Sequence, residues 1–407
     1  MRIAVFVKST TFHTGYGGLE TQNKLLCEGL VKKGHDISVF SPQRELKFET
    51  KYDNGVKYHF LPSIYKLTSF KNKQNWVYKS VEAFKKHYLD NPFNLVVSQS
   101  SAGLGVIKNK AEFNVPIISI SHGTIIGEFR TNIQVAKGIK GYLHLLKDAI
   151  FVLRVFFGRQ RQFIHGSNKI VAVSSVVKEA LINETFVSEE KIIVINNGID
   201  PALFKNDSFQ NSPDFSYNPT ILYVGQITRS KGLDTVLKLA LEPEFSNIEF
   251  NIIGGGDYLE ELKSLSEKEN ITSRFKIHGK KPYAELITYL NQLQNAVFVF
   301  PTKRYEGFPM VLVESLFLGF PVVAYDVGGV KDAVINGETG ALIPSEEYGT
   351  FKEAVLKIAK DVQTYKTYSE NSRKYAYNNL TSEKMIERYE QVFKEVLEKH
   401  ENITNNL

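Results

Sequence analysis

Short apolar runs alternate with amphipathic stretches along almost the whole chain. The apolar runs of the first half are RIAVFVKS, DISVFSP, NLVVSQS, VPIISISH, KIVAVSS and KIIVINN. Between them lie stretches such as LETQNKLLCEGLVKKGH, in which apolar residues recur at helical spacing. A strand followed by an amphipathic helix, repeated many times, is typical of βαβ units built around a parallel sheet.

The alternation is interrupted at residues 196–219, NNGIDPALFKNDSFQNSPDFSYNP, which are rich in Asn, Asp, Pro and Ser. A second set of apolar runs then follows: TILYVGQ, IEFNIIGGG, FKIHGK, NAVFVFP and PVVAYD. The chain closes with helical patterns that end in SEKMIERYEQVFKEVLEKH. We therefore expect an α/β protein with two Rossmann-like domains, joined near residue 200, whose parallel sheets face a cleft.

Length and composition agree with a two-domain globular protein. The chain has 407 residues, more than one core usually organises, and 43% of its residues are hydrophobic. The single cysteine, Cys27, excludes an internal disulfide, and its apolar helical context favours a buried structural thiol. The start MRIAVFVKST lacks the pattern of a signal peptide, and no apolar run is long enough for a spanning helix. We expect a cytoplasmic protein.

Two carboxylates, Glu306 and Glu314, flank the start of an apolar helix in RYEGFPMVLVESLFLGFPVVAYDVGG, residues 304–329. Pro309 suits the first helical position, and Gly319 suits the end of the helix. The unpaired N–H groups and positive dipole of such a helix start form an anion site. The alternative is that Glu306 only favours the dipole and that Glu314 is a solvated helical residue.

Two glycine loops test for a dinucleotide site. In TGYGGLE, residues 14–20, the third glycine position of G-x-G-x-x-G is occupied by Glu20, and in IIGGGDYLEEL, residues 252–262, it is occupied by Leu259. Neither loop therefore matches the fingerprint of a nicotinamide oxidoreductase. Both loops could still bring backbone N–H groups close to a phosphate, or they could simply be tight strand-to-helix turns.

Cations and a histidine follow other predicted strands. The loop VGQITRSKGLD, residues 224–234, places Arg229 and Lys231 before an amphipathic helix, where they could clamp a diphosphate or remain solvated. His122 ends an apolar strand and could hydrogen-bond a substrate hydroxyl, or it could be a satisfied structural histidine. The sequence contains no D-x-D and no Cys/His cluster with metal spacing, so we expect neither a metal nor another cofactor.

The order of these motifs resembles that of a known family. GYGGLE, SHGT, NNGID, YVGQITRSKGLD, GGGD, HGK, EGFPMVLVESLFLGFPVVAYDVGG and NGETGALIP together resemble the family 4 retaining glycosyltransferases of GT-B fold, over residues 1 to about 345. The family's E-x7-E motif matches Glu306 to Glu314. The resemblance implies an acceptor-binding domain (1–200), a nucleotide-sugar-binding domain (201–375) and a C-terminal helix (376–407) that packs back on the N-terminal domain.

The resemblance also implies roles for single residues. Glu306 would lie beside the donor sugar as a catalytic residue, Glu314 would hold the ribose hydroxyls, and His122 would contact a sugar hydroxyl. The other implied donor-binding residues are loop glycines, two cations and the backbone at the helix start: Gly17, Gly18, Gly225, Arg229, Lys231, Gly256, Gly307, Phe308, Pro309 and Met310.

The chain departs from the family pattern at Gln226, where relatives usually carry an arginine, so one expected diphosphate cation is missing from its place. The resemblance implies a metal-independent hexosyltransferase that retains anomeric configuration, in the synthesis of a cell-surface polysaccharide or glycolipid. Two alternatives stay open: a GT-B sugar-nucleotide epimerase, and a catalytically weak nucleotide-sugar-binding protein.

The charge of the chain is unevenly divided. Residues 1–200 hold 27 Lys and Arg against 16 Asp and Glu, a net charge of +11, while the remainder holds 23 against 28, or −5. Residues 63–89 and 129–164 interleave cations with aromatic and apolar residues, as suits the surface of an anionic membrane. We expect a sugar or lipid-linked acceptor at such a surface and no nucleic-acid partner, since no binding module accompanies the charge. Solvated basic helices that cover a core are the alternative.

Overall fold

The structure of the chain is a computed structural model, which describes residues 1–13, 17–64, 74–135, 149, 152, 155–204 and 217–405. The chain forms two compact units. Unit 1 comprises Met1–Phe129, Gly138–Gly198 and Ser382–Leu407, and unit 2 comprises Arg130–Lys137 and Ile199–Thr381.

Unit 1 contains an eight-stranded sheet in the order β3-β4-β2-β1-β5-β6-β7-β8. The strands are β1 (Arg2–Phe6), β2 (Asp36–Pro42), β3 (Thr50–Asp53), β4 (Val56–Leu61), β5 (Leu95–Gln99), β6 (Ile117–Ser121), β7 (Lys169–Ala172) and β8 (Ile192–Val194). All neighbours are parallel except β3, which pairs antiparallel with β4. This hairpin was not predicted, although Asn54 and Gly55 form its turn with positive φ values of 47° and 79°.

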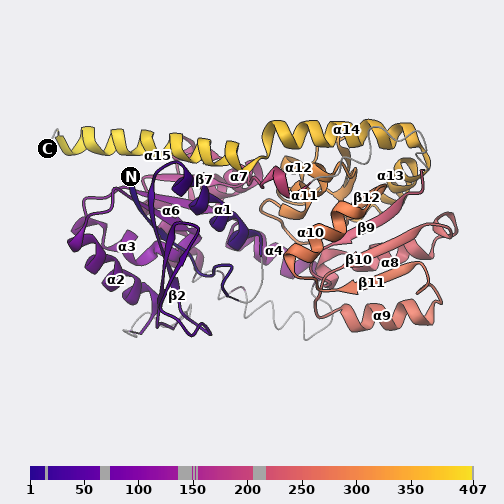
Figure 1. Ribbon diagram of the computed structural model, residues 1–407, viewed down its shortest axis with the longest axis horizontal. Helices are drawn as coiled ribbons and strands as arrows, with labels where there is room; N and C mark the ends of the chain where they lie inside the picture. Colours follow the sequence, from indigo (N-terminus) through magenta and orange to yellow (C-terminus); the bar gives the residue numbers. More distant parts are fainter. Residues whose placement is uncertain are drawn as a thin grey trace. The chain divides into compact units, whose positions relative to one another are not determined.

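Helices flank the sheet of unit 1. They are α1 (Gly18–Lys32), α2 (Trp76–Asp90), α3 (Leu104–Lys108), a π-helical turn (Phe156–Gln160), α6 (Arg161–Gly166), α7 (Ser175–Thr185) and α15 (Ser382–Asn405). Helix α4 (Ile125–Val135) begins in unit 1, and its residues from Arg130 on belong to unit 2. Short 3₁₀ turns lie at Ser100–Gly103, Lys110–Glu112, Glu189–Lys191 and, in unit 2, Pro201–Leu203. The last helix, α15, runs alongside α1, where Ile386 lies against Gly29 (Figure 1).

Unit 2 contains a six-stranded, all-parallel sheet in the order β11-β10-β9-β12-β13-β14. Its strands are β9 (Thr220–Val224), β10 (Glu249–Ile253), β11 (Phe275–Gly279), β12 (Ala296–Phe300), β13 (Val322–Tyr325) and β14 (Gly340–Ile343). Strand order proceeds in one direction from β9 and in the other from β12. The two neighbours β9 and β12 therefore form a topological switch point, the place where open α/β sheets bind ligands at the carboxyl ends of their strands.

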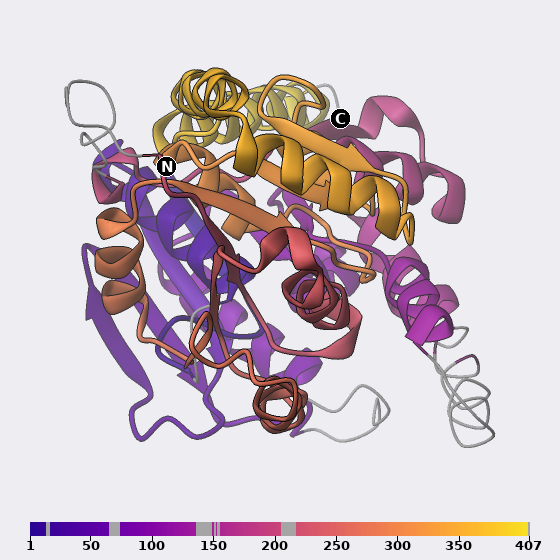
Figure 2. The ribbon, with the colours of Figure 1, turned by 90° about the vertical axis from the view of Figure 1, so that its right-hand side faces the viewer.

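The helices of unit 2 are α8 (Leu233–Leu241), α9 (Leu259–Lys268), α10 (Tyr283–Gln292), α11 (Met310–Leu318), α12 (Val330–Ala333), α13 (Tyr348–Lys360) and α14 (Val362–Asn379), with 3₁₀ turns at Arg229–Lys231 and Pro243–Phe245. Leu233, Val236, Phe351 and Val355, from α8 and α13, pack with the strands in one buried cluster. Figure 2 shows α13 crossing this sheet. The predicted class, two Rossmann-like α/β folds, is confirmed.

Within the part of the chain described here, no helix combines the length and apolar character needed to span a bilayer. The two basic stretches predicted to face a membrane, 63–89 and 129–164, lie partly outside the described residues, which omit 65–73, 136–148 and four positions between 150 and 154.

Candidate active site

The loops that follow β9 and β12 are joined by backbone hydrogen bonds. The N–H groups of Lys303 and Arg304 both donate to the carbonyl oxygen of Ser230, at 2.9 and 3.1 Å. Because β9 and β12 are neighbours, this join lies at the carboxyl-end switch point of the unit 2 sheet. The loop carrying Lys231 is thereby fixed against the loop carrying Glu306.

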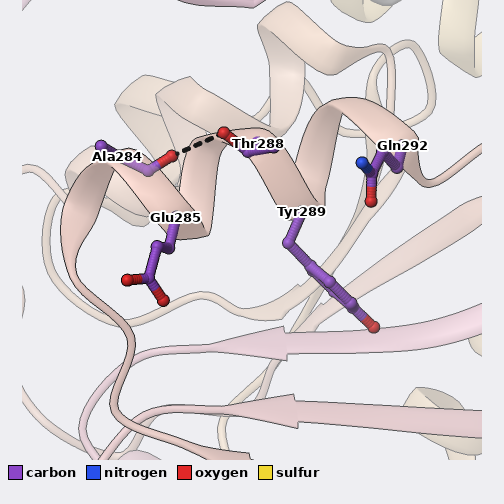
Figure 3. A pocket seen from close by; sticks show the side chains of 5 residues that line it. All are labelled: Ala284, Glu285, Thr288, Tyr289 and Gln292. Atoms are coloured by element: carbon purple, nitrogen blue, oxygen red, sulfur yellow. Dashed lines mark hydrogen bonds between the residues drawn. The ribbon is translucent and has the colours of Figure 1, made fainter.

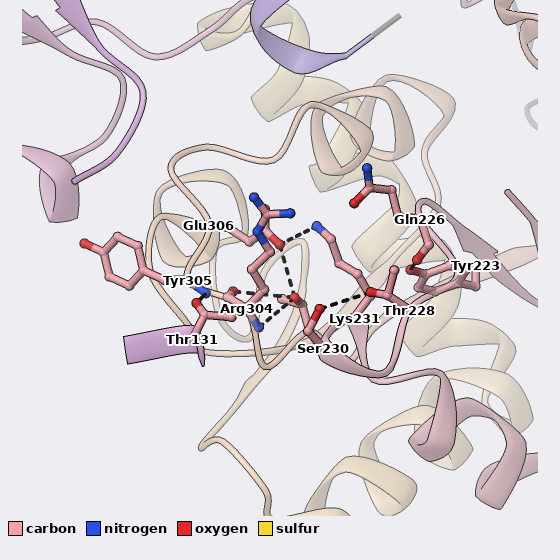
Figure 4. A network of polar contacts seen from close by, with 10 residues as sticks. Thr131, Tyr223, Gln226, Thr228, Ser230, Lys231, Arg304, Tyr305 and Glu306 are labelled. Carbon is pink, nitrogen blue, oxygen red and sulfur yellow. Dashed lines mark hydrogen bonds and ion pairs between the residues drawn. The ribbon is translucent and has the colours of Figure 1, made fainter. Parts of the chain in front are cut away.

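Lys231 and Glu306 form an ion pair at this join (Figure 4). The Lys231 ammonium donates to Glu306 Oε1 at 2.5 Å, and the two side chains are only 12% and 13% exposed. The Thr302 hydroxyl donates to the same Oε1 at 3.1 Å. The Glu306 carboxylate is therefore held by specific partners, and the interpretation that it only favours the helix dipole is insufficient.

The backbone of Glu306 is fixed by a residue that sequence analysis missed. The Gly329 N–H donates to the Glu306 carbonyl at 2.8 Å. Gly328 has a φ of +63°, and a Cβ there would lie 2.3 Å from the same carbonyl oxygen. The signal was present in the VGG that ends the quoted stretch, since a positive φ and a close backbone approach are the usual reasons for a loop glycine.

The apolar helix α11 starts one residue later than predicted. Pro309 is the N-cap, with φ −76° and ψ 112°, so Met310 is the first helical residue. Proline restricts its own φ but not its ψ, and here ψ is extended. No side chain caps the helix start, and Gly319 ends the helix with a φ of 70°, as predicted. With Pro309 outside the helix, its missing N–H costs the first turn nothing.

Glu314 lies inside α11 and is only 6% exposed, so the alternative of a solvated helical residue is wrong. The Tyr283 hydroxyl, at the start of α10, donates to Glu314 Oε1 at 3.2 Å. Burial raises the pKa of Glu314 to about 7, because the charged carboxylate loses water and the tyrosine hydrogen bond offsets only part of that loss. The carboxyl group is thus poised between its two protonation states near neutral pH.

Arg229 is not brought together with the Lys231–Glu306 pair. Its guanidinium pairs with Glu261, lies 3.4 Å from Asp234 Oδ1, and stacks over the Tyr258 ring at 4.3 Å. These contacts hold the Arg229 guanidinium on an exposed surface of unit 2.

Arg304 is a cation that sequence analysis missed. Its backbone belongs to the join described above, and its side chain is exposed, with no ion pair to any residue that the structure describes. Figure 4 shows Arg304, Glu306, Lys231 and Gln226 as parts of one polar network. The signal was its place in RYEG, two residues before Glu306.

Close backbone packing explains several glycines of the predicted donor loops. A Cβ at Gly254 would lie 1.7 Å from the carbonyl oxygen of Gly225, and a Cβ at Gly256 would lie 2.2 Å from that of Ile227. The loops after β9 and β10 therefore pack backbone against backbone. This packing requires Gly254 and Gly256 whether or not a phosphate approaches them.

Three of the predicted residues, Gly17, Gly18 and His122, belong to unit 1. Gly17 is the N-cap of α1 and Gly18 is its first residue, while residues 14–16 of the same motif lie outside the described part. His122 follows β6, and its Nε2 lies 2.7 Å from Gln99 Oε1. Burial, together with the charge of Lys8, lowers the pKa of His122 to about 4, so the ring is neutral at pH 7.

One surface cavity is lined by none of these residues. It has a volume of about 330 Å³ and is lined by α10 residues (Figure 3): Ala284, Glu285, Thr288, Tyr289 and Gln292. None of them is a predicted site residue. Among the residues described, no group of three or more His, Cys, Asp or Glu side chains could hold a metal ion.

Comparison with known proteins gives consecutive matches to two protein families. Residues 16–203 match the model described as Glycosyltransferase Family 4, and residues 204–375 match the model described as Glycosyl transferases group 1. The capsular polysaccharide biosynthesis glycosyltransferase CapM of Staphylococcus aureus is 27% identical over 390 residues, which cover 92% of this chain and 93% of CapM. The uncharacterized glycosyltransferase MJ1178 of Methanocaldococcus jannaschii is 25% identical over 380 residues, 91% of this chain and 94% of that protein.

Solved structures show the same fold at lower sequence identity. A sucrose-phosphate synthase from Thermosynechococcus elongatus superposes with a TM-score of 0.77 at 19% identity, covering 98% of this chain and 99% of that structure. Anabaena HepE, solved in complex with UDP and glucose, gives a TM-score of 0.70 at 15% identity, with 97% and 99% covered. At these identities the similarity concerns the fold.

Proposed function

We propose that this chain transfers a sugar from a nucleoside-diphosphate sugar held by unit 2. The two family matches together span residues 16–375, and the chain is a glycosyltransferase of GT-B fold. The observation that carries the proposal is the Lys231–Glu306 pair at the switch point of the unit 2 sheet. It sets one cation and one carboxylate where parallel sheets bind ligands.

The two charges suit the two ends of the bond that breaks. Cleavage of a sugar–phosphate bond builds positive charge on the anomeric carbon and negative charge on the departing diphosphate. Lys231 would stabilise the departing diphosphate, and Glu306 would orient the sugar and offset its cationic charge. Before a donor binds, the two side chains neutralise each other, which keeps two largely buried charges paired.

A second cation for the diphosphate is supplied in this proposal by Arg304. Gln226 replaces the usual arginine, and Arg229 is engaged with Glu261 and Asp234. Arg304 is held by its backbone to the loop that carries Lys231, and its guanidinium is exposed. A guanidinium binds diphosphate oxygens with two parallel hydrogen bonds, which fits the missing function.

Glu314 would hold the ribose of the donor. A carboxylate can accept hydrogen bonds from two vicinal hydroxyls, and Tyr283 orients one oxygen of this carboxylate. Backbone groups of Gly307, Phe308 and Met310 would meet the diphosphate at the uncapped start of α11. Gly225 would line the same loops, and in unit 1 Gly17, Gly18 and His122 would approach the substrates.

The stereochemistry, metal requirement and donor class of the transfer are part of the same proposal. We infer retention of anomeric configuration by front-face attack, without a covalent enzyme intermediate and without a metal, on a hexosyl donor. Similarity to CapM and the positive charge of residues 1–200 support a role in cell-surface polysaccharide or glycolipid synthesis, with a lipid-linked acceptor at an anionic membrane. The epimerase and weak-binding alternatives are not favoured by the family matches.

Slow hydrolysis of the donor tests this proposal without knowledge of the acceptor. The protein is incubated with α-linked UDP-, GDP-, ADP- and dTDP-sugars, and the first sugar released is identified by proton NMR before it mutarotates. We expect the α-anomer from one donor, and a loss of its release in Glu306→Ala. Initial release of the β-anomer would overturn retention, interconversion of sugar nucleotides would indicate an epimerase, and full activity of Glu306→Ala would refute the role of Glu306.

A further inference from the structure

A chain of buried polar side chains leads to His122 through the interior of unit 1. Gln22 and Asn23 on α1, Gln99 at the end of β5 and Tyr389 on α15 are each at most 1% exposed. Gln99 Oε1 lies 2.7 Å from His122 Nε2, and Gln22 Nε2 lies 3.4 Å from the Tyr389 hydroxyl. These contacts tie the imidazole to two helices of the unit.

The hydrogen bonds of Gln99 fix the orientation of its amide. Its Nε2 donates to Gln22 Oε1 and to Asn23 Oδ1, both at 3.0 Å, which uses both of its hydrogens. In the reversed orientation the Gln99 carbonyl would face the two carbonyl oxygens of Gln22 and Asn23, and a buried amide pays for such unpaired acceptors. The Gln99 oxygen is therefore the atom that faces His122.

This orientation determines the tautomer of the imidazole. An amide oxygen only accepts hydrogen bonds, so His122 Nε2 must carry the hydrogen. At neutral pH the ring carries a single proton, since its pKa is lowered to about 4. Nδ1 therefore keeps a free lone pair, and it makes no hydrogen bond to any residue that the structure describes.

We propose that Gln99 is a positioning residue that locks His122 in the Nε2–H form, so that His122 Nδ1 accepts a hydrogen bond from a hydroxyl of the substrate sugar. The inference rests on the proposed glycosyl transfer. It assigns a direction to that contact: the ring selects a hydroxyl donor, and it offers nothing to a deoxy carbon or to an ether oxygen. It also means that His122 does not supply positive charge to the leaving diphosphate.

The tautomer is measured directly by nitrogen-15 NMR of the histidine side chains, with no substrate present. His13 is an internal reference, since its Nδ1 accepts from the Thr10 N–H at 3.0 Å and its Nε2 lies 2.9 Å from the Pro42 carbonyl oxygen. We expect His122 to show the same pattern as His13, with a protonated Nε2 and an unprotonated Nδ1. In Gln99→Leu the His122 signals should shift while those of His13 stay. A protonated Nδ1 in the unaltered protein would overturn the inference.

Kinetics with a series of deoxy donors tests the contact between His122 and the sugar hydroxyl. Deoxy analogues of the accepted sugar are compared, one hydroxyl at a time, and one of them should lose about tenfold in kcat/KM, the equivalent of one hydrogen bond. Gln99→Leu should remove this discrimination, because leucine cannot accept from Nε2–H and leaves the ring free to adopt either tautomer. A merely structural role for Gln99 would lower turnover of all analogues equally. If no sugar is transferred at all while the NMR result holds, the proposed function fails and the tautomer assignment stands.

Discussion

Glu314 is a carboxyl group whose burial has a measurable cost. Its pKa is raised from 4.5 to about 7, so between these values the folded protein binds a proton that the unfolded chain has lost. Stability should therefore fall as pH rises from about 4.5 to about 7. Glu314→Gln removes the titration and keeps an oxygen for Tyr283. We expect it to stabilise the donor-free protein by up to about 3 kcal/mol at pH 8 and to change little at pH 4.5.

Urea unfolding at the two pH values measures this effect. Glu260→Gln is the matched control, because the Glu260 side chain is 81% exposed and forms a surface ion pair with Lys263 on α9. That variant should leave stability unchanged at both pH values. Glu314→Gln should also weaken donor binding, since an amide accepts fewer hydroxyls than a carboxylate. Equal stability of Glu314→Gln and the parent at pH 8 would contradict the account of this carboxyl.

The Lys231–Glu306 pair should be strongly coupled. Lys231→Met leaves a largely buried carboxylate without its cation, which we expect to cost about 2–3 kcal/mol of unfolding free energy. The double variant with Lys231→Met and Glu306→Leu should recover part of that loss, because neither charge then remains to be desolvated. Denaturant titration of both single variants and the double variant completes the cycle. Simple additivity would show that the pair does not interact in solution.

At the residue scale, prediction from sequence succeeded where chemistry follows from a local pattern. The helix that carries Glu314 and the loop that carries Glu306 were both predicted from Pro309, Gly319 and the apolar run between them. The ion pair that keeps Arg229 away from Glu306 could not be predicted, because its partner Glu261 comes from another element, α9. The burial of Glu314 likewise depends on how α10 and Tyr283 pack, which no local pattern encodes.

The loops after β9 and β10 act as one element because their backbones touch. A Cβ at Gly256 would lie 2.2 Å from the Ile227 carbonyl oxygen, whereas at Gly255 the nearest atom is the Lys280 Cβ at 3.4 Å. We expect Gly256→Ala to destabilise the protein by about 1–3 kcal/mol and to weaken nucleotide binding, since the loop carrying Lys231 would shift. Gly255→Ala should be close to neutral. Thermal unfolding compares the two, and equal effects would refute the packing argument.

At the element scale, alternating apolar runs and amphipathic stretches predicted the long strands and helices of both sheets. The hairpin of β3 and β4 was not predicted, because β3 is exposed along most of its length and no apolar run marks it. The start of α11 differed by one residue because proline fixes φ but leaves ψ free, and the observed ψ of 112° keeps Pro309 outside the helix. Element type was thus encoded locally, while boundaries depended on tertiary contacts.

The uneven distribution of charge along the chain predicts that the protein binds anionic membranes. With a net charge of +11 over residues 1–200, we expect the protein to sediment with vesicles that contain phosphatidylglycerol at low salt. Vesicles of phosphatidylcholine alone are the control, and 0.5 M salt should release the protein because screening shortens the reach of each charge to a few ångströms. Failure to sediment with the anionic vesicles would remove the membrane from the proposal.

The two-domain α/β class followed from length and from the single polar interruption of the pattern, and the order of motifs gave the family resemblance. Neither could specify the base, the sugar or the acceptor, because backbone contacts and pocket shape decide these. The proposal that Arg304 is the second diphosphate cation needed the structure, since it depends on two loops from distant parts of the chain being joined at Ser230.

Lys231 is the residue through which we propose that unit 2 binds a nucleoside diphosphate. The most direct measurement is a thermal-shift series with UDP, GDP, ADP and dTDP, with NAD and NADP as controls, on the parent protein, Lys231→Ala and Lys263→Ala. At 100 times its Kd, the matching diphosphate should add about 2.7 kcal/mol of stability. We expect one diphosphate to stabilise the parent and Lys263→Ala but not Lys231→Ala. Stabilisation by NAD or NADP alone, or equal stabilisation of all three proteins, would contradict it.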